Sequence, residues 1–259
     1  MRLIASLLFA ALLAGCSTGL QINHDHPSVN YDSRAQYIIL HYTSAPQARS
    51  LALLTHGEVS AHYLIGDDAP ATVFQLVDEN QRAWHAGESE WQGRTWLNSD
   101  SIGIEIVNPG YLDTPTGRVW YPYSEAQIEH VIALVRDIAA RHRIPARNII
   151  GHSDIAPLRK QDPGPLFPWK RLADAGLGIW PSPAAVAQQK ARFDVNLPNI
   201  AWFQHQLARV GYAVPQSGVL DITTIHVLAA FQMHFRPQRY DGQPDAQSAA
   251  ILQVLANMP

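Results

Sequence analysis

The alternation of apolar and polar positions predicts a chain that mixes short strands with helices. Apolar and β-branched residues gather in short runs bounded by turn residues, which is typical of buried strands. The runs that we expect to be strands are residues 36–42, 62–65, 73–77, 102–107 and 148–150. A long segment with helical spacing lies between the last two of these strands. This order of elements predicts an α/β domain over about residues 36–178.

The clearest helix is expected from Glu125 to about Arg143. Ser124 and Gln127 form a capping-box pattern at its start. Its apolar residues recur every three or four positions and form one stripe, made of Ile128, Val131, Ile132, Val135, Ile138 and Ala139. Pro145 stops the helix, because proline has no backbone N–H to donate.

A proline-rich stretch at residues 177–183 is typical of a domain boundary. We expect residues 179–196 to form a linker and residues 197–257 to form a small domain of three helices. Within that domain, apolar residues at helical spacing predict one helix that ends near Gly211 and others at residues 222–235 and 246–255. No internal repeat of convincing length is visible.

The N-terminus has the pattern of an export signal over residues 1–15. A basic start precedes twelve apolar or small residues, whose helix would rise about 18 Å and so fall short of the ~30 Å hydrocarbon core of a bilayer. The sequence Leu-Ala-Gly-Cys, ending at Cys16, resembles the lipobox of bacterial lipoproteins, which implies lipidation of Cys16 and retention on a membrane. An ordinary signal peptide with an incidental cysteine is the alternative. Ser17 replaces the aspartate that retains lipoproteins in the inner membrane, so we expect the periplasmic face of the outer membrane, with residues 16–35 as a tether.

Composition narrows the possible partners. The chain has 259 residues, 47% of them hydrophobic, which is enough for a medium domain and a small one. Its formal net charge of −3 does not suggest a nucleic-acid partner, because binding a polyanion needs a basic surface. With one cysteine, the chain has no internal disulfide. We expect it to be a monomer.

Three residues have the chemistry of an open zinc site. His41 lies at the end of one apolar strand and His152 directly follows another, and strand ends present side chains to surface clefts. Asp162 precedes Pro-Gly-Pro in a loop of restricted shape. Each residue alone has an ordinary structural explanation, but two histidines and an aspartate together leave a fourth zinc position for water.

Glu105 is a single charge in an apolar strand. Strand alternation places it on the face opposite Ile102, Ile104 and Ile106, among apolar neighbours. Because an unpaired buried carboxylate is costly, Glu105 needs either a salt-bridge partner or a chemical role. It is a candidate general base, and Lys160 is a candidate donor to a developing oxyanion.

Six ordered motifs resemble the N-acetylmuramoyl-L-alanine amidases of type 2, the peptidoglycan-recognition-like family. They are residues 41–43, 60–65, 83–87, 101–108, 151–155 and 160–164. The resemblance implies an α/β fold with a mixed β-sheet flanked by helices, one zinc ion per chain, and cleavage between muramic acid and L-alanine in wall degradation or recycling. It implies that His41, His152 and Asp162 bind the zinc and that Glu105 and Lys160 are the catalytic pair. Peptidoglycan and muropeptides would be the substrates.

One difference from a branch of this family bears on the catalytic mechanism. The phage lysozyme branch of the family has a tyrosine where Ala61 stands and a cysteine where Asp162 stands, so a tyrosine-based mechanism is not expected. Trp84 and His85 are candidates for lining the substrate cleft, with core packing as the alternative for Trp84. Asn108 is a third candidate, and His62 is interpreted as structural.

The C-terminal helices resemble the three-helix peptidoglycan-binding domain, which implies attachment to wall polymer. Two other functions stay open. A zinc peptidase acting inside the stem peptide would use the same chemistry. A recognition module would keep the fold without the metal, although that alternative requires a missing ligand.

Overall fold

The computed structural model describes residues 20–258, which fall into two units. Residues 20–32 have no helix or strand, and the remainder, from Ser33, is compact. The predicted lipidation site, Cys16, lies outside the described residues. The expected tether was too long at its C-terminal end, because Ala35 is buried and Arg34 donates a hydrogen bond to the carbonyl oxygen of Glu79 at 2.8 Å.

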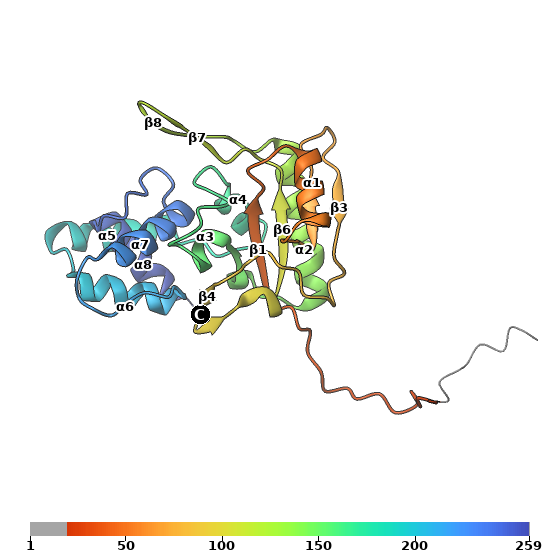
Figure 1. Cartoon of the computed structure of the whole chain (residues 1–259). Coiled ribbons are helices and arrows are strands. Elements are labelled where there is room, and N and C mark those ends of the chain that lie inside the picture. The colour runs from red at the N-terminus through yellow and green to blue at the C-terminus, as the bar shows by residue number, and fades with distance from the viewer. Residues whose placement is uncertain (1–19, 259) are drawn as a thin grey trace, which may run out of the picture. The chain divides into compact units, whose positions relative to one another are not determined.

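The compact unit is built around a five-stranded mixed sheet (Figure 1). Its strands, in the order β3-β2-β6-β1-β9, are Val73–Gln75, Tyr63–Ile65, Ser101–Ile106, Tyr37–Tyr42 and Ile149–Gly151. Only β3 runs antiparallel to its neighbour. This confirms the predicted fold class, and all five strands were expected within two residues of their observed ends.

The two faces of the sheet have different helices. On one face, the apolar stripe of α2 (Glu125–His142) packs on Ile38, Leu40 and the isoleucines of β6. The predicted capping box is present, since Ser124 accepts from the backbone N–H of Gln127. On the other face, α1 (Gln47–His56) places Leu54 against Leu64 and Val107. The sequence analysis did not predict α1.

Several short strands, helices and turns lie outside the five-stranded sheet. They are β4 (Glu90–Trp91), β5 (Arg94–Thr95), β7 (Tyr111–Thr114), β8 (Gly117–Trp120), α3 (His152–Ile155), α4 (Trp169–Asp174) and two 3₁₀ turns, Leu97–Ser99 and Ala146–Asn148. The β7–β8 hairpin was not predicted either. In Figure 1 it extends from the sheet on the side of the C-terminal helices, and the indole N–H of Trp120 donates to the Tyr240 hydroxyl at 2.8 Å.

The C-terminal helices differ from the prediction in one respect. Helices α6 (Ile200–Val210), α7 (Ile222–Phe235) and α8 (Ala246–Leu255) lie where they were expected. The expected linker, however, forms a fourth helix, α5 (Pro183–Val195), which packs on α8. The prolines that suggest a boundary are compatible with this helix, because Ser182 caps it and Pro183 occupies its first position.

The C-terminal helices share a hydrophobic core with the sheet. Ile39 of β1, Trp91 of β4 and Ile155 of α3 belong to the same buried cluster as Phe203, Phe231 and Leu252. Residues 33–258 are therefore one compact body and not two domains on a flexible connection. In the part of the chain that the structure describes, every helix is too short or too polar to cross a bilayer.

Candidate active site

His41, His152 and Asp162 meet at the carboxyl edge of the sheet. His41 is on β1, His152 begins α3 directly after β9, and Asp162 lies in the loop after α3. The Nδ1 atoms of the two histidines are 2.9 Å apart, and Oδ2 of Asp162 is 3.1 Å from His41 Nδ1 and 3.0 Å from His152 Nδ1. All three side chains are buried. The structure thus brings together three side chains that are distant in the sequence.

This triangle fits a zinc ion. Tetrahedral zinc with bonds of about 2.0–2.1 Å requires its ligand atoms to be about 3.3 Å apart, and the observed separations are 2.9–3.1 Å. The ring of His152 is held for this role, because its Nε2 lies 3.0 Å from the carbonyl oxygen of Ala86. That carbonyl can only accept, so Nε2 carries the proton and the Nδ1 lone pair faces the triangle.

The charges of the cluster suit a cation. Burial alone would raise the pKa of Asp162, but His152 and His41 outweigh it and hold that pKa well below its usual value. Burial lowers the pKa of His41 to about 4. Near neutral pH Asp162 is therefore an anion and His41 is a neutral imidazole, which are the forms that bind zinc.

Glu105 lies beside His41 in the sheet. The two residues are register partners on the parallel strands β1 and β6. Glu105 Oε2 is buried and has no hydrogen-bond partner among the described residues. Burial, with the nearby charge of Asp162, raises the pKa of Glu105 to about 8. Glu105 forms no salt bridge within residues 20–258. A carboxylate with a buried, unpartnered oxygen beside a metal-ligand cluster is suited to proton transfer.

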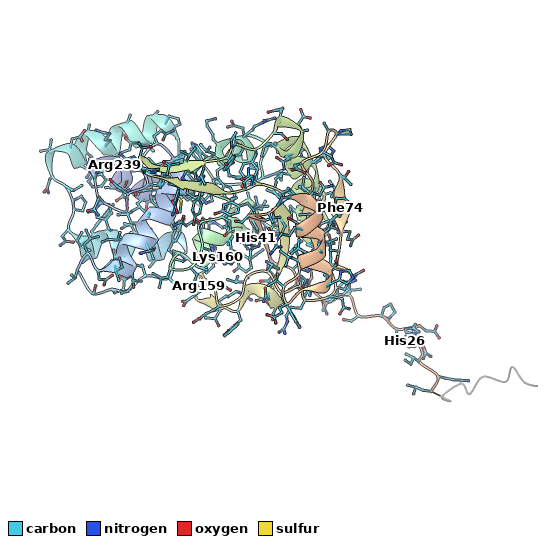
Figure 2. All side chains as sticks on the ribbon, turned by 45° about the horizontal axis from the view of Figure 1, so that its top comes forward. His26, His41, Phe74, Arg159, Lys160 and Arg239 are labelled. Carbon is cyan, nitrogen blue, oxygen red and sulfur yellow. The ribbon has the colours of Figure 1, made fainter. Side chains whose placement is uncertain are left out.

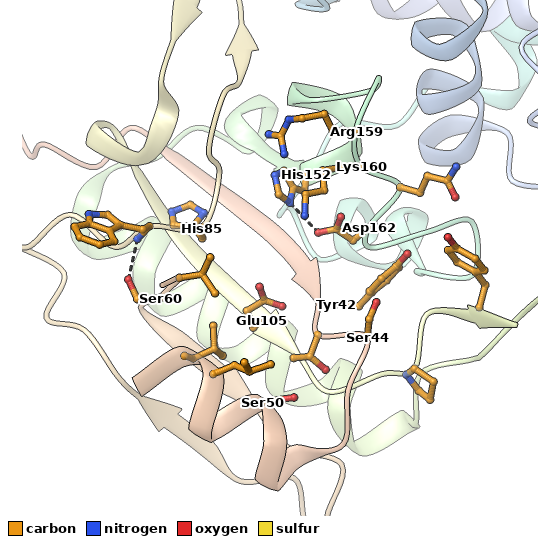
Figure 3. A pocket seen from close by; sticks show the side chains of 18 of the residues that line it. Tyr42, Ser44, Ser50, Ser60, His85, Glu105, His152, Arg159, Lys160 and Asp162 are labelled. Atoms are coloured by element: carbon orange, nitrogen blue, oxygen red, sulfur yellow. Dashed lines mark hydrogen bonds and ion pairs between the residues drawn. The ribbon is translucent and has the colours of Figure 1, made fainter. Parts of the chain in front are cut away.

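Lys160 faces the same cavity as Glu105 (Figure 3). Its ammonium group donates no side-chain hydrogen bond to any residue between 20 and 258. Figure 2 shows Lys160 and His41 between the orange helix α1 and the blue C-terminal helices. A cation without an internal partner is available to stabilise negative charge on a bound substrate.

The cluster opens into a cavity of about 710 Å³. Trp84, 56% exposed, lies in its wall and not in the core. The lining also contains residues that the sequence analysis missed: Tyr42, Tyr111, Arg159 and His226. His226 belongs to α7, so the C-terminal helices contribute to the cavity wall. No local pattern singles out these residues, because only packing brings them to the cavity.

The other predicted site residues have different surroundings. Asn108 is absent from the lining of the cavity, and its amide donates to the carbonyls of Tyr121 and Pro122 while its Oδ1 accepts from the Gly110 N–H. These hydrogen bonds shape a turn, so they account for the polar side chain of Asn108 without any contact to substrate. His62 is structural as predicted, because its Nδ1 accepts from the Gly103 N–H at 2.9 Å. His85 is largely buried, contacts His41 and also borders the cavity.

A polar group on the far side of His152 was also missed. Asp154 is fully buried, and it accepts hydrogen bonds from the backbone N–H of Gly151 at 2.8 Å and from the Tyr212 hydroxyl at 2.6 Å. Nδ1 of His234 on α7 lies 2.8 Å from the same carboxylate. The C-terminal helices thus hold the segment that carries a metal-ligand candidate. The Gly-His-Ser-Asp sequence contains Asp154 and could have drawn attention to it. The two side chains that contact Asp154, however, lie 58 and 80 residues further along the chain.

Comparison with known proteins agrees with this fold. Residues 31–165 match the N-acetylmuramoyl-L-alanine amidase family, and residues 196–252 match a family of peptidoglycan binding domains. The chain belongs to the N-acetylmuramoyl-L-alanine amidase family, as its ordered motifs predicted.

Individual relatives are similar over almost the whole chain. The N-acetylmuramoyl-L-alanine amidase AmiD of Escherichia coli K12 is 40% identical over 95% of this chain and 94% of its own. The crystal structure of AmpDh3 from Pseudomonas aeruginosa has a TM-score of 0.84 at 40% identity, covering 91% of this chain and 97% of that one. A complex of Escherichia coli AmiD with anhydro-N-acetylmuramic acid-L-Ala-D-γ-Glu-L-Lys has a TM-score of 0.82 at 38% identity, covering 92% and 95%.

Proposed function

We propose that this chain is a zinc-dependent amidase that hydrolyses the bond between the lactyl group of muramic acid and L-alanine in anhydro-muropeptides. The observation that carries the proposal is the triangle of His41 Nδ1, His152 Nδ1 and Asp162 Oδ2 beside the unpartnered Glu105 carboxylate. Solved relatives support the substrate, since AmpDh3 binds an anhydromuramic pentapeptide and AmiD binds an anhydro-muramyl tripeptide.

Each of these side chains has its own role in the proposed reaction. A zinc ion bound by the triangle would polarise the attacking water and the scissile carbonyl. The positive charge of a bound zinc would favour the ionised form of Glu105. In that form Glu105 accepts a proton from the water and returns it to the leaving nitrogen of L-alanine, so that water is added across the C–N bond. Lys160 stabilises the negative charge that develops on the carbonyl oxygen. The products are a lactyl carboxylate and a free stem peptide.

The two ends of the chain suggest where the enzyme works. Cys16 in its lipobox-like sequence supports a lipid anchor on the periplasmic face of the outer membrane, with Ser17 allowing export to that membrane. The C-terminal helices match peptidoglycan binding domains, which supports attachment to wall polymer. We propose that the anchored monomer degrades or recycles wall fragments there.

A digestion experiment tests the proposed function. Purified protein is incubated with an anhydro-muropeptide, the products are identified by mass spectrometry, and the zinc content is measured by elemental analysis. The proposal expects about one zinc per chain, with release of the intact stem peptide and the sugar. Cuts inside the stem peptide would indicate a zinc peptidase, and binding without cleavage would indicate a recognition module. Metal-free protein with full activity would overturn the zinc assignment.

A further inference from the structure

His85 borders the cavity, but its Nδ1 atom is directed at the metal-ligand candidate His41. It lies between β3 and β4, in the segment Ala83–Gly87, and its side chain is 8% exposed. Its Nδ1 is 3.0 Å from His41 Nε2, and the two rings meet edge to face. Trp84, the preceding residue, is turned outward into the cavity wall. The two residues expected to contact substrate therefore have different surroundings.

A chain of hydrogen bonds sets the direction of each proton from His85 to His41. The chain ends at the carbonyl oxygen of Leu97, which can only accept, so the Ser101 hydroxyl donates to it at 2.6 Å. With its single proton used, Ser101 Oγ accepts from Nε2–H of His85 at 3.2 Å. Neutral His85 then has an unprotonated Nδ1, which accepts from Nε2–H of His41. His41 is left with its Nδ1 lone pair directed at the triangle.

The backbone around His85 is held firmly in this position. Oδ1 of Asn98 accepts from the N–H groups of both His85 and Ala86, at 3.0 and 2.8 Å. Ala86 in turn supplies the carbonyl that orients His152. Thus His85 contacts His41 through its side chain, and Ala86 contacts His152 through its backbone carbonyl.

Gly103 makes room for the ring. A Cβ built at Gly103 would lie 2.3 Å from Cγ of His85, closer than any real contact. Gly103 is on β6, two residues before Glu105 and on the same face. The sheet therefore has a gap beside the catalytic carboxylate, and the imidazole of His85 fills it.

We propose that His85 is a positioning residue that selects the zinc-binding tautomer of His41 and fixes its ring. This inference rests on the proposed zinc site. Groups that hold a metal-bound histidine in this way are typically worth about 10- to 100-fold in metal affinity. A substrate contact would change KM and leave zinc affinity unaltered.

Zinc affinity of the full chain separates the two roles. The dissociation constant is measured by competition with a chromogenic chelator for wild type, His85→Ala and Trp84→Ala. We expect His85→Ala to weaken zinc binding about 10- to 100-fold, with kcat restored when zinc is raised to saturation and with KM little changed. Trp84→Ala is the matched neighbour, and we expect a higher KM with unchanged zinc affinity.

Three further variants separate positioning from simple loss of packing. His85→Asn keeps a carbonyl acceptor near the position of Nδ1, so it should recover most of the zinc affinity lost in His85→Ala. Ser101→Ala removes the acceptor for His85 Nε2–H and should weaken zinc binding by a smaller factor. Gly103→Ala removes no polar group but displaces the ring, so it should resemble His85→Ala. Thermal unfolding of each variant identifies any that fail to fold.

The outcomes distinguish this inference from the proposed function. If the wild-type protein binds no zinc, the proposed function fails. If the wild type binds zinc and His85→Ala binds it equally well, the positioning role is overturned. A raised KM with unaltered zinc affinity in His85→Ala would restore the substrate contact expected from the sequence. Equal weakening in His85→Asn and His85→Ala would show that the acceptor atom is not what matters.

Discussion

Tyr212 donates its hydroxyl proton to Oδ1 of Asp154 at 2.6 Å, two residues beyond the metal-ligand candidate His152. Tyr212 follows α6, and Asp154 lies in α3 at the end of the sheet. Both side chains are buried. His234 also contacts the Asp154 carboxylate through Nδ1, and its ring stacks on that of Trp169 with the ring centres 3.9 Å apart. The C-terminal helices therefore support the metal-ligand region from behind.

A chain shortened after Gly178 is expected to lose solubility and activity. It would expose the apolar surface that Ile39, Trp91 and Ile155 share with the C-terminal helices, and it would leave the Asp154 carboxylate without two of its partners. Circular dichroism, gel filtration and cleavage of a soluble muropeptide measure the effect. A folded, monomeric, fully active shortened chain would show that the C-terminal helices act only as a wall-binding module.

Tyr212→Phe is expected to destabilise the full chain by about 1–3 kcal/mol. The ring and its packing remain, but one oxygen of the buried Asp154 loses its donor. Thermal or urea unfolding measures the loss. Tyr31→Phe is the control, because Tyr31 is 81% exposed and should tolerate the same change without effect.

Glu105→Gln is expected to slow muropeptide cleavage by about 10²- to 10⁴-fold. Glutamine has nearly the same shape as glutamate but cannot accept the proton at Oε2. Zinc content should stay near that of the wild type, because Glu105 is not one of the three converging ligand atoms. Single-turnover rates and elemental analysis measure both quantities. Glu90→Gln, at an exposed position on β4, is the control. A near-normal rate for Glu105→Gln would reduce the residue to a structural carboxylate.

Lys160→Ala is expected to lower kcat by about 10²–10³, comparable to the loss of other oxyanion donors. Lys160 is in the cavity wall and its proposed role is electrostatic, so zinc binding should persist. Steady-state kinetics on a soluble anhydro-muropeptide measure the change. Lys170→Ala, which removes only an exposed pair with Asp174, should leave the rate unchanged. An effect on KM alone would place Lys160 in substrate binding.

Glu79 is expected to make stability depend on acidic pH. Burial would raise its pKa, but hydrogen bonds from Arg141, Tyr63 and His142 outweigh burial and lower that pKa to about 2. In the unfolded chain the carboxyl titrates near its ordinary value of 4.5. Its stabilisation is therefore complete above about pH 5 and is lost as the pH falls towards 2, where the folded state must also take up the proton.

The variant Glu79→Gln isolates this contribution. It should unfold at a lower temperature than the wild type at pH 7, and the difference between the two proteins should shrink as the pH falls from 5 towards 2. Melting temperatures measured across that range check the prediction. The exposed Glu58→Gln should follow the wild-type curve throughout. A difference that stays constant with pH would mean that Glu79 acts through packing alone.

The sequence alone determined the elements whose signals are local. The observed ends of α7 and α8 match the helical spacing and the Asp221 cap, and α2 has the predicted capping box and apolar stripe. His41, His152 and Asp162 were identifiable because strand ends and a constrained loop have short sequence patterns. Signals of this kind lie within a few residues, where side-chain spacing and capping act directly on the backbone.

Only the tertiary structure decided which side chains meet. Glu105 stands beside His41 because β1 and β6 pair in parallel with these residues in register, and strand order cannot be inferred from either segment alone. His85 was assigned to substrate, yet it turns to His41 because Gly103 leaves space for its ring. The expected linker became α5 through its packing on α8, and Tyr212 reaches Asp154 across 58 residues. These relationships depend on contacts between distant segments, whose free energy is gained only when the whole core has formed.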